Sequence, residues 1–222
     1  MNRFTEDTER LAEHYTQLVE THGDSPEAVQ MTSRESHERR LEILTQVVTG
    51  DYGKVLDFGC GTGELYGYIT RKNRAVCNYV GYDISAAMTE LAQNKFERAR
   101  FECRDIFTDG IGDMFDYVFI SGVFNNLMSD NWGFMKAVLT KLFAYTNKAI
   151  SFNGLSTYVD YFDEGLFYID PAKVFTFCKE NLSSSVTLRH DYSVKPGVVP
   201  FDYTMYVYQS DIAPRKNLVQ AD

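Results

Sequence analysis

The first fifty residues carry their apolar side chains at helical spacing. Residues 11–19 place four such side chains on one face of a predicted helix. The polar stretch THGDSPEA at 21–28 breaks this pattern. A second helix is predicted to start at Thr32, which forms a capping box with Glu35, and to carry its apolar face at 41–48.

From residue 54 onward, short apolar runs alternate with segments of helical spacing. The predicted strands cover residues 54–59, 78–83, 99–105, 115–122 and 148–154. Helices are predicted to begin near Gly63, at Ser85, at Asp130 or Asn131, and at Asp170 with Pro171 as the first helical residue. Such an alternation predicts a parallel sheet with helices on both faces.

The last two predicted strands differ from the others. Residues 185–192 and 201–209 alternate apolar and polar positions with only a loop between them, so they predict an antiparallel hairpin. We therefore expect an α/β fold with a doubly wound sheet of seven strands, mostly parallel, whose last strand is reversed. The chain is interpreted as one domain, 1–222, divided into N-terminal helices that act as a lid (1–50), a core (51–210) and a tail (211–222).

Composition narrows the classes of function. The chain has 222 residues, is 44% hydrophobic and 24% charged, and has a formal net charge of -9, which is typical of a soluble globular protein and disfavours nucleic-acid binding. No apolar run is long enough to span a bilayer, and the charged N-terminus lacks the apolar segment of a signal peptide, so we expect a cytoplasmic protein without a membrane partner. The scattered cysteines favour neither a metal site nor a disulfide framework: Cys60, Cys77, Cys103 and Cys178.

A glycine-rich loop follows the first strand. The sequence VLDFGCGTG at 55–63 places Gly59, Gly61 and Gly63 where a strand meets a helix, and Asp83 ends the next strand about twenty residues later. Such a loop presents backbone N–H groups to a ligand, and a strand-end carboxylate can accept hydrogen bonds from ribose hydroxyls, so an adenosine-containing cofactor is predicted. A nicotinamide-dependent oxidoreductase is one candidate, but Glu64 stands where the third glycine of its motif belongs.

Three motifs resemble those of the class I S-adenosylmethionine-dependent methyltransferases: VLDFGCGTG, YVGYDIS with Asp83, and FECRDIF with Asp105. The resemblance covers roughly residues 32–208 and implies a Rossmann-like fold with S-adenosylmethionine as cofactor. The later stretches SGVFNN, SFNGLS and LRHDY look like small bacterial enzymes of the trans-aconitate methyltransferase-like group, an analogy that does not fix the substrate.

The resemblance also implies cofactor-binding residues, which are Asp57, Gly59, Gly61, Gly63, Asp83, Ile84, Asp105, Ile106 and Ser121. In the family pattern the glycines line the methionine and ribose, Asp83 binds the ribose hydroxyls, Asp105 accepts from the adenine amino group, and Asp57 orients the loop. Asp105 could instead only cap a turn. Arg40 is a further candidate at the edge of an inward-facing helix stripe, where its partner is either the methionine carboxylate or a protein carboxylate.

Polar residues after the later strands predict the acceptor site, because ligands of open α/β sheets lie beyond the carboxyl ends of the strands. The candidate acceptor-binding residues are Tyr15, Asn125, Asn153, Tyr158, Tyr192 and Tyr203. His190 is the candidate general base, with a structural strand-end role as the alternative.

FNNL at 124–127 differs from the Asn/Asp-Pro-Pro-aromatic motif of enzymes that methylate amino groups of nucleic acids. We therefore expect methyl transfer to an oxygen or nitrogen of a small molecule, without a metal, by a monomer or homodimer. A non-catalytic subunit or sensor that binds the cofactor is the other alternative, and an open acceptor pocket would favour the enzyme.

Overall fold

The computed structural model describes residues 3–23, 25, 33–74 and 78–210. It contains one sheet whose main path runs β3-β2-β1-β4-β5-β8-β7. The strands are β1 (Lys54–Phe58), β2 (Asn78–Asp83), β3 (Arg100–Cys103), β4 (Phe115–Ile120), β5 (Thr146–Ser156), β6 (Tyr168–Ile169), β7 (Val186–Arg189) and β8 (Asp202–Tyr208). The helices are α1 (Thr5–His22), α2 (Arg34–Thr45), α3 (Glu64–Arg71), α4 (Ala86–Lys95), α5 (Asn131–Phe143) and α6 (Pro171–Asn181).

The sheet topology confirms the predicted fold. Strands β1 to β5 pair in parallel, whereas β8 runs antiparallel to both β5 and β7. The short strand β6 is an addition that the sequence pattern did not predict, and it pairs with the end of β5 through Leu155–Tyr168 and Ser156–Ile169. The fold is therefore a Rossmann-like sheet with a reversed strand near its edge.

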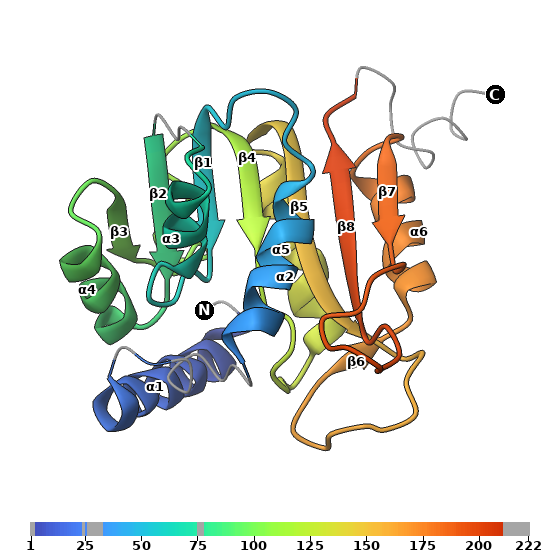
Figure 1. Ribbon diagram of the computed structural model, residues 1–222, viewed down its shortest axis with the longest axis horizontal. Coiled ribbons are helices and arrows are strands. Elements are labelled where there is room, and N and C mark those ends of the chain that lie inside the picture. The colour runs from blue at the N-terminus through green and yellow to red at the C-terminus, as the bar shows by residue number, and fades with distance from the viewer. Residues whose placement is uncertain (1–2, 24, 26–32, 75–77, 211–222) are drawn as a thin grey trace.

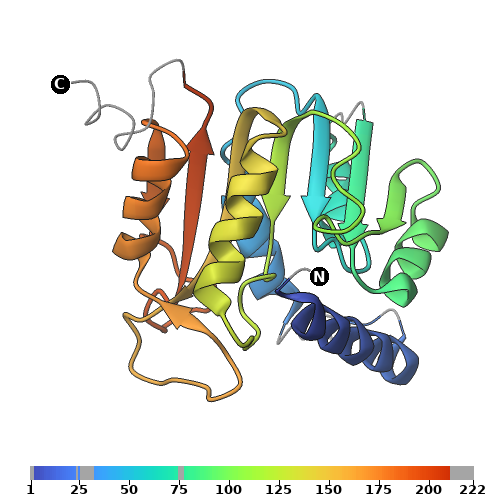
Figure 2. The same cartoon turned by 180° about the vertical axis from the view of Figure 1, so that it is seen from behind.

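Both faces of the sheet are covered by helices (Figures 1 and 2). Helices α2 and α3 lie on one face and α5 and α6 on the other. Strand β4 needs apolar residues on both sides, and it has them: Tyr117 and Phe119 belong to the buried cluster on the side of α2 and α3, whereas Val118 and Ile120 belong to the cluster on the side of α5 and α6. This double cover explains why β4 reads as a nearly continuous apolar run.

Local sequence signals fix the helix starts. Ser85 caps α4, Asp130 caps α5, and Asp170 caps α6 with Pro171 as the first helical residue, as predicted. The N-cap of α2 is Ser33, which accepts a hydrogen bond from the amide of Ser36. The predicted cap Thr32, the Cys77 thiol and the predicted tail 211–222 lie outside the described residues.

Helix α1 lies beside the carboxyl ends of β1, β2 and β4 instead of on a face of the sheet (Figure 1). Hydrogen bonds hold it on two sides: Thr16 Oγ1 lies 3.1 Å from Ser85 Oγ at the start of α4, and the Tyr15 hydroxyl accepts from Asn126 Nδ2 at 2.7 Å. Of the N-terminal helices expected to form a lid, α1 therefore crosses the strand ends. Helix α2 packs on the sheet, where Ser151 Oγ donates to the carbonyl of Leu44.

Within the described residues, no helix combines the length and the apolar character needed to cross a membrane. The same part of the chain holds no group of three or more His, Cys, Asp or Glu side chains arranged to bind a metal ion.

Candidate active site

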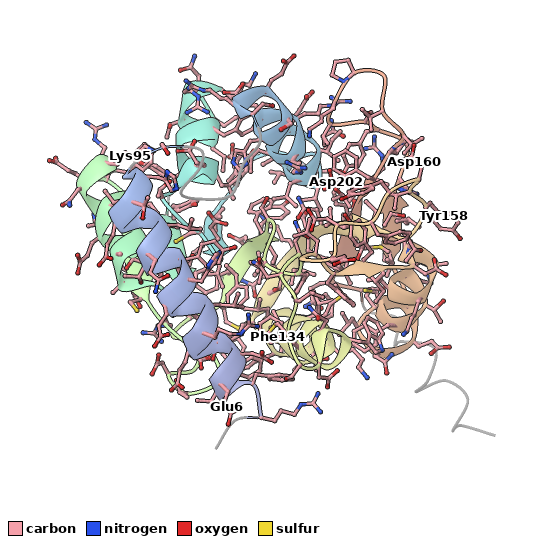
Figure 3. All side chains as sticks on the ribbon, turned by 90° about the horizontal axis from the view of Figure 1, so that it is seen from below. Glu6, Lys95, Phe134, Tyr158, Asp160 and Asp202 are labelled. Carbon is pink, nitrogen blue, oxygen red and sulfur yellow. The ribbon has the colours of Figure 1, made fainter. Side chains whose placement is uncertain are left out.

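A cavity of about 360 Å³ lies between α1 and the carboxyl ends of the parallel strands. Its size falls in the range of small-molecule sites, and its position is where ligands bind open α/β sheets. Figure 3 looks onto these strand ends: α1 runs along one side, whereas Tyr158 and Asp160 lie on the far side. Many predicted site residues line this cavity: Tyr15, Arg40, Asp57, Gly59, Gly61, Asp83, Ile84, Asp105, Ile106, Ser121 and Asn125.

The glycine loop wraps the end of β1. Its backbone is in the left-handed region at Gly59, Gly61 and Gly63, with φ values of 73°, 52° and 82°. A side chain at Gly59 would overlap Val123, and one at Gly63 would press on the rings of Phe96 and Phe101. Gly63 does not line the cavity, so its absent side chain serves the turn into α3 and the packing against those two rings.

Asp83 joins the glycine loop to the start of α4. Its Oδ2 accepts from the Gly61 amide at 2.9 Å, and its Oδ1 accepts from the Ser85 amide at 3.0 Å. Burial raises the pKa of Asp83, whereas these backbone hydrogen bonds act in the opposite direction. The carboxylate is thus held in place at the end of β2 while still lining the cavity.

Asp57 lies beneath the loop at the end of β1. It is buried and accepts a hydrogen bond of 2.5 Å from the Tyr79 hydroxyl. Burial raises its pKa to about 7; the Tyr79 hydrogen bond lowers it and the Asp83 charge adds to the rise. A buried carboxyl group that also lines the cavity will respond to any positive charge placed beside it.

An apolar wall follows β3. Asp105 Oδ1 accepts from the Phe107 amide at 2.8 Å, so this carboxylate caps the turn and also lines the cavity. Ile106 is buried, and with Ile84 and Met88 it gives this end of the cavity apolar surfaces. The arrangement suits a flat ring with a polar edge, because the ring can lie between apolar side chains beside a carboxylate.

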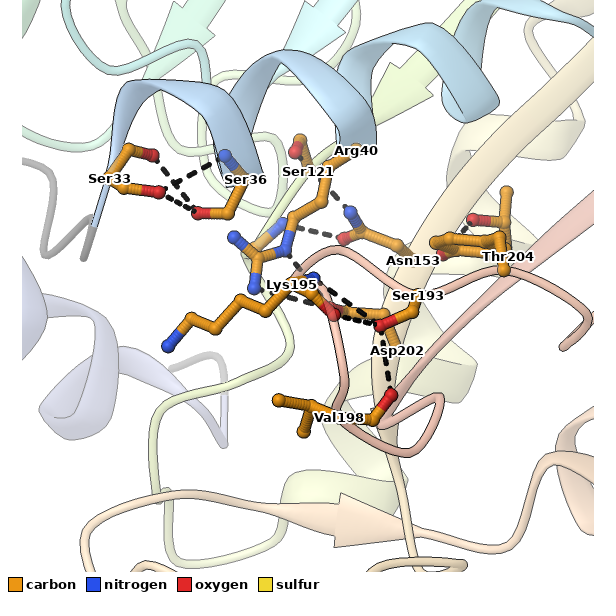
Figure 4. Close-up of polar contacts among 12 residues, drawn as sticks. Ser33, Ser36, Arg40, Ser121, Asn153, Ser193, Lys195, Val198, Asp202 and Thr204 are labelled. Carbon is orange, nitrogen blue, oxygen red and sulfur yellow. Dashed lines mark hydrogen bonds and ion pairs between the residues drawn. The ribbon is translucent and has the colours of Figure 1, made fainter.

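Arg40 binds a protein carboxylate. Its Nε lies 3.2 Å from both carboxylate oxygens of Asp202, and Nη2 lies 3.2 Å from Asp202 Oδ2 (Figure 4). Asp202 is only 2% exposed, so the guanidinium group balances a buried charge. Of the two partners expected for Arg40, this structure contains the protein carboxylate.

Asn153 supports the loop after β4 instead of lining the cavity. Its Oδ1 accepts from the Gly122 amide at 2.9 Å, and its Nδ2 lies 3.5 Å from Ser121 Oγ (Figure 4). Asn125, in the same loop, does line the cavity, and its buried Oδ1 has no hydrogen-bond partner among the described residues. Asn125 therefore has an acceptor atom available for a ligand.

The structure does not bring His190 into the cavity lining. Strand β7 is the edge strand beyond β8, which carries His190 away from the ends of β1 and β4. Its Nε2 lies 2.9 Å from the carbonyl oxygen of Pro200, so it ties together the two ends of the β7–β8 loop. This geometry corresponds to the structural alternative and removes the contact that a general base needs.

Three predicted acceptor tyrosines also lie outside the cavity lining. Tyr158 is 62% exposed and packs against the His190 ring. The Tyr192 hydroxyl lies 2.7 Å from Thr204 Oγ1, and Tyr203 is fully buried in the core. Side chains alternate between the two faces of the sheet along β8. Because Asp202 points toward α2, its neighbour Tyr203 points to the opposite face and into the core.

Sequence reasoning missed several cavity residues. His37 is 8% exposed, and neither of its ring nitrogens has a partner among the described residues. Burial lowers the pKa of His37 to about 4, so its ring is neutral at pH 7. Its position one helical turn before Arg40 could have revealed it, whereas no spacing pattern points to Tyr168, Lys195 or Phe201.

The comparisons with known proteins decide the family. Residues 56–147 match a family described as a methyltransferase domain. A protein of Mycobacterium tuberculosis that carries a methyltransferase name is 33% identical over 154 residues, which are 67% of this chain and 92% of that protein. The chain belongs to the class I S-adenosylmethionine-dependent methyltransferases. S-adenosylmethionine is therefore its cofactor, and the nicotinamide alternative is set aside.

Two further relatives extend the comparison of this methyltransferase. The structure of magnesium protoporphyrin IX methyltransferase from Synechocystis PCC 6803 with bound S-adenosylmethionine has the same fold, with a TM-score of 0.65 and 15% identity over 92% of this chain and 97% of that chain. The ribosomal RNA small subunit methyltransferase C of Vibrio vulnificus is 25% identical over 142 residues, which are 61% of this chain and 41% of that protein. One name refers to a porphyrin and the other to RNA, so these names do not fix the acceptor.

The charge of the cavity lining complements that of the cofactor. Four acidic residues line the part around the glycine loop: Asp57, Glu64, Asp83 and Asp105. An acidic surrounding favours a ligand whose sulfur carries a positive charge. Gly59 and Gly61 border the cavity without side chains, so a ligand can approach the loop backbone closely, and the wall after β3 adds apolar surfaces.

Proposed function

We propose that this methyltransferase acts on an oxygen or nitrogen of a small-molecule acceptor. One observation supports this most strongly: the cavity that contains the glycine loop continues to a second part lined by Leu155, Leu166, Tyr168 and Phe201. The whole space measures about 360 Å³ and has α1 along one side. Such a volume favours a compact acceptor over a folded nucleic acid or protein.

The cofactor roles of individual residues are part of this proposal. Asp83, which backbone amides orient at the edge of the cavity, accepts hydrogen bonds from the ribose hydroxyls. Asp105 accepts from the adenine amino group, and Ile106 packs against the ring. Gly59 and Gly61 border the methionine and ribose, and Asp57 lies near the positive end of the cofactor.

The chemistry requires alignment more than proton transfer. The cofactor supplies a methyl group on a positively charged sulfur. The sulfur is already a good leaving group because of that charge. The protein must hold the acceptor atom in line with the carbon–sulfur bond, and such positioning can itself supply a large part of the rate enhancement. Tyr15 on α1 and Asn125 in the loop after β4, which both line the cavity, orient the acceptor in this proposal.

Helix α1 excludes water from the site in the same proposal. Its Asp7 accepts from the amide and the hydroxyl of Ser129 at 2.9 and 2.5 Å, and its Tyr15 accepts from Asn126. Because all three hydrogen bonds come from the loop between β4 and α5, opening the site requires α1 to leave that loop. Cofactor and acceptor would then enter through the gap and be covered when the bonds re-form.

Isotope transfer tests the acceptor class. The purified protein would be incubated with methyl-labelled S-adenosylmethionine and, separately, with the small-molecule, RNA and protein fractions of a cell extract. We expect labelled methyl groups in the small-molecule fraction, and a loss of that label with Asp83→Ala. Label found only in RNA or only in protein would contradict the proposal.

A further inference from the structure

The part of the cavity away from the glycine loop combines apolar walls with two cationic side chains. Leu155, Leu166 and Phe201 contribute apolar surface, and Arg40 and Lys195 contribute positive charge. This differs from the part that surrounds the glycine loop, where the charged lining residues are acidic. The two parts therefore offer opposite charges to their ligands.

The charge of Arg40 is already balanced, but that of Lys195 is not. Arg40 contacts both carboxylate oxygens of Asp202, as Figure 4 shows. Lys195 has no carboxylate within ion-pair distance among the residues that the structure describes, and its ammonium group extends away from Asp202 (Figure 4). Two cations and one carboxylate leave this part of the cavity with one uncompensated positive charge.

The loop between β7 and β8 holds Lys195 in a defined place. Ser193 Oγ lies 2.5 Å from the carbonyl oxygen of Lys195 and 3.0 Å from that of Val198, which folds the loop around the lysine (Figure 4). His190 contacts the carbonyl of Pro200 and so closes the loop at its base. An ordered loop lowers the entropic cost of binding a ligand through Lys195.

We propose that the methyl acceptor carries an acidic group, a carboxylate or a phosphonate-like anion on an apolar body, and that Lys195 binds that group. This inference rests on the proposed function, since it names the class of acceptor that the second part of the cavity takes. The apolar walls strengthen the ion pair because they keep competing water away. Asn125 Oδ1, which is buried and without a partner among the described residues, accepts from a hydroxyl or N–H of the same acceptor.

The electrostatics of Asp202 support the placement of this charge. Burial raises the pKa of Asp202, and the charges of Arg40, Lys195 and His190 oppose that rise. Lys195 is therefore close enough for its field to reach the Arg40–Asp202 pair, although it makes no bond to it. The Lys195 ammonium group attracts Asp202 only from a distance. It would attract an anion placed between the lysine and the apolar walls more strongly.

Paired probes test the inference without knowledge of the natural acceptor. The protein would first be saturated with S-adenosylhomocysteine, and binding of phenylacetate, phenylphosphonate and the neutral phenylacetamide would be measured by ligand-observed NMR and calorimetry. We expect at least one of the acids to bind about tenfold or more tightly than the amide. Which acid binds better distinguishes a carboxylate from a phosphonate site.

Lys195→Met should weaken binding of the acid by about tenfold or more and leave binding of the amide unchanged. Lys173→Met is the matched control, because Lys173 is exposed on α6 and lies over the Trp132 ring outside the cavity lining. Equal binding of acid and amide, binding of neither, or insensitivity of the acid to Lys195→Met would overturn the inference. Failure of S-adenosylhomocysteine to bind would instead count against the proposed function.

Discussion

Asp83 braces the loop that it faces: its Oδ2 accepts from the Gly61 amide at 2.9 Å, across a separation of 22 residues in the sequence. The other oxygen accepts from the Ser85 amide, so the carboxylate is fixed before a ligand arrives. Burial raises the pKa of this carboxylate, whereas backbone hydrogen bonds from Ser85, Gly61 and Ile84 act in the opposite direction. The end of β2 therefore presents an oriented carboxylate to the cavity.

Asp57 should make folding stability depend on pH. Its pKa is about 7 in the folded protein against 3.8 for an ordinary Asp, so the folded state binds more protons than the unfolded state between these values. This group therefore lowers stability as pH rises from about 4 to about 7, by at most about 1.4 kcal/mol per pH unit. Asp57→Asn removes the effect and keeps an oxygen acceptor for Tyr79.

Urea unfolding of the wild type and of Asp57→Asn between pH 4 and pH 8 measures this pH dependence of stability. We expect the wild type to lose stability relative to Asp57→Asn up to about pH 7 and to run parallel with it above that pH. If the difference in unfolding free energy between the two proteins stays constant from pH 4 to pH 8, the pKa of Asp57 in the folded protein is not raised.

His37 should act in the opposite direction. Its pKa is about 4 in the folded protein against 6.5 for an ordinary His, so the unfolded state binds more protons between these values. Stability from this group is present above about pH 6.5 and is lost as pH falls toward 4. His37→Gln should therefore lose less unfolding free energy than the wild type when the pH is lowered from 7 toward 4. A variant that loses stability in parallel with the wild type would refute the neutral, buried state of His37.

The tether of α1 should control cofactor release. Asp7→Ala removes the acceptor of two hydrogen bonds from Ser129, and hydrogen bonds to charged groups are worth about 1.5–3 kcal/mol. We expect S-adenosylhomocysteine to dissociate about tenfold or more faster, and the amides of α1 to exchange their hydrogens faster. Stopped-flow displacement and hydrogen exchange measure these two changes.

Glu6→Ala is the matched control for this tether. Glu6 is exposed, lies in the same first turn and loses the same charge, so both variants change the helix dipole interaction alike. Equal release rates for the two variants would mean that the Asp7–Ser129 contact does not hold the helix over the site.

The fold was predictable because local sequence patterns indicate most of its helices and strands. The alternation of apolar runs with helical spacing predicted the parallel strands, and the reversed strand followed from the alternating segment 201–209. Strand β6 has only two residues, which is too short for any period to be visible. Its pairing with β5 depends on tertiary contacts alone, so the sequence pattern could not predict it.

The site was predictable where it depends on one loop and one strand end. Gly59 and Gly61 come just after β1, Asp83 ends β2 and Asp105 comes two residues after β3, and all four line the cavity. His190 also follows a strand, but its location depends on the order of strands across the sheet, which local pattern does not reveal. In the same way, Lys195 reaches the cavity only because a loop of the hairpin folds back toward α2.

Calorimetric titration of Asp83→Ala with S-adenosylhomocysteine tests the central claim most directly, since the account makes this carboxylate the receptor of the ribose and the brace of the glycine loop. The wild type should bind S-adenosylhomocysteine and not NAD⁺. Asp83→Ala should remain folded by circular dichroism and bind at least about tenfold more weakly, because hydrogen bonds to a charged acceptor are lost. Unchanged affinity in a folded variant, or binding of NAD⁺ in preference to S-adenosylhomocysteine, would contradict the account.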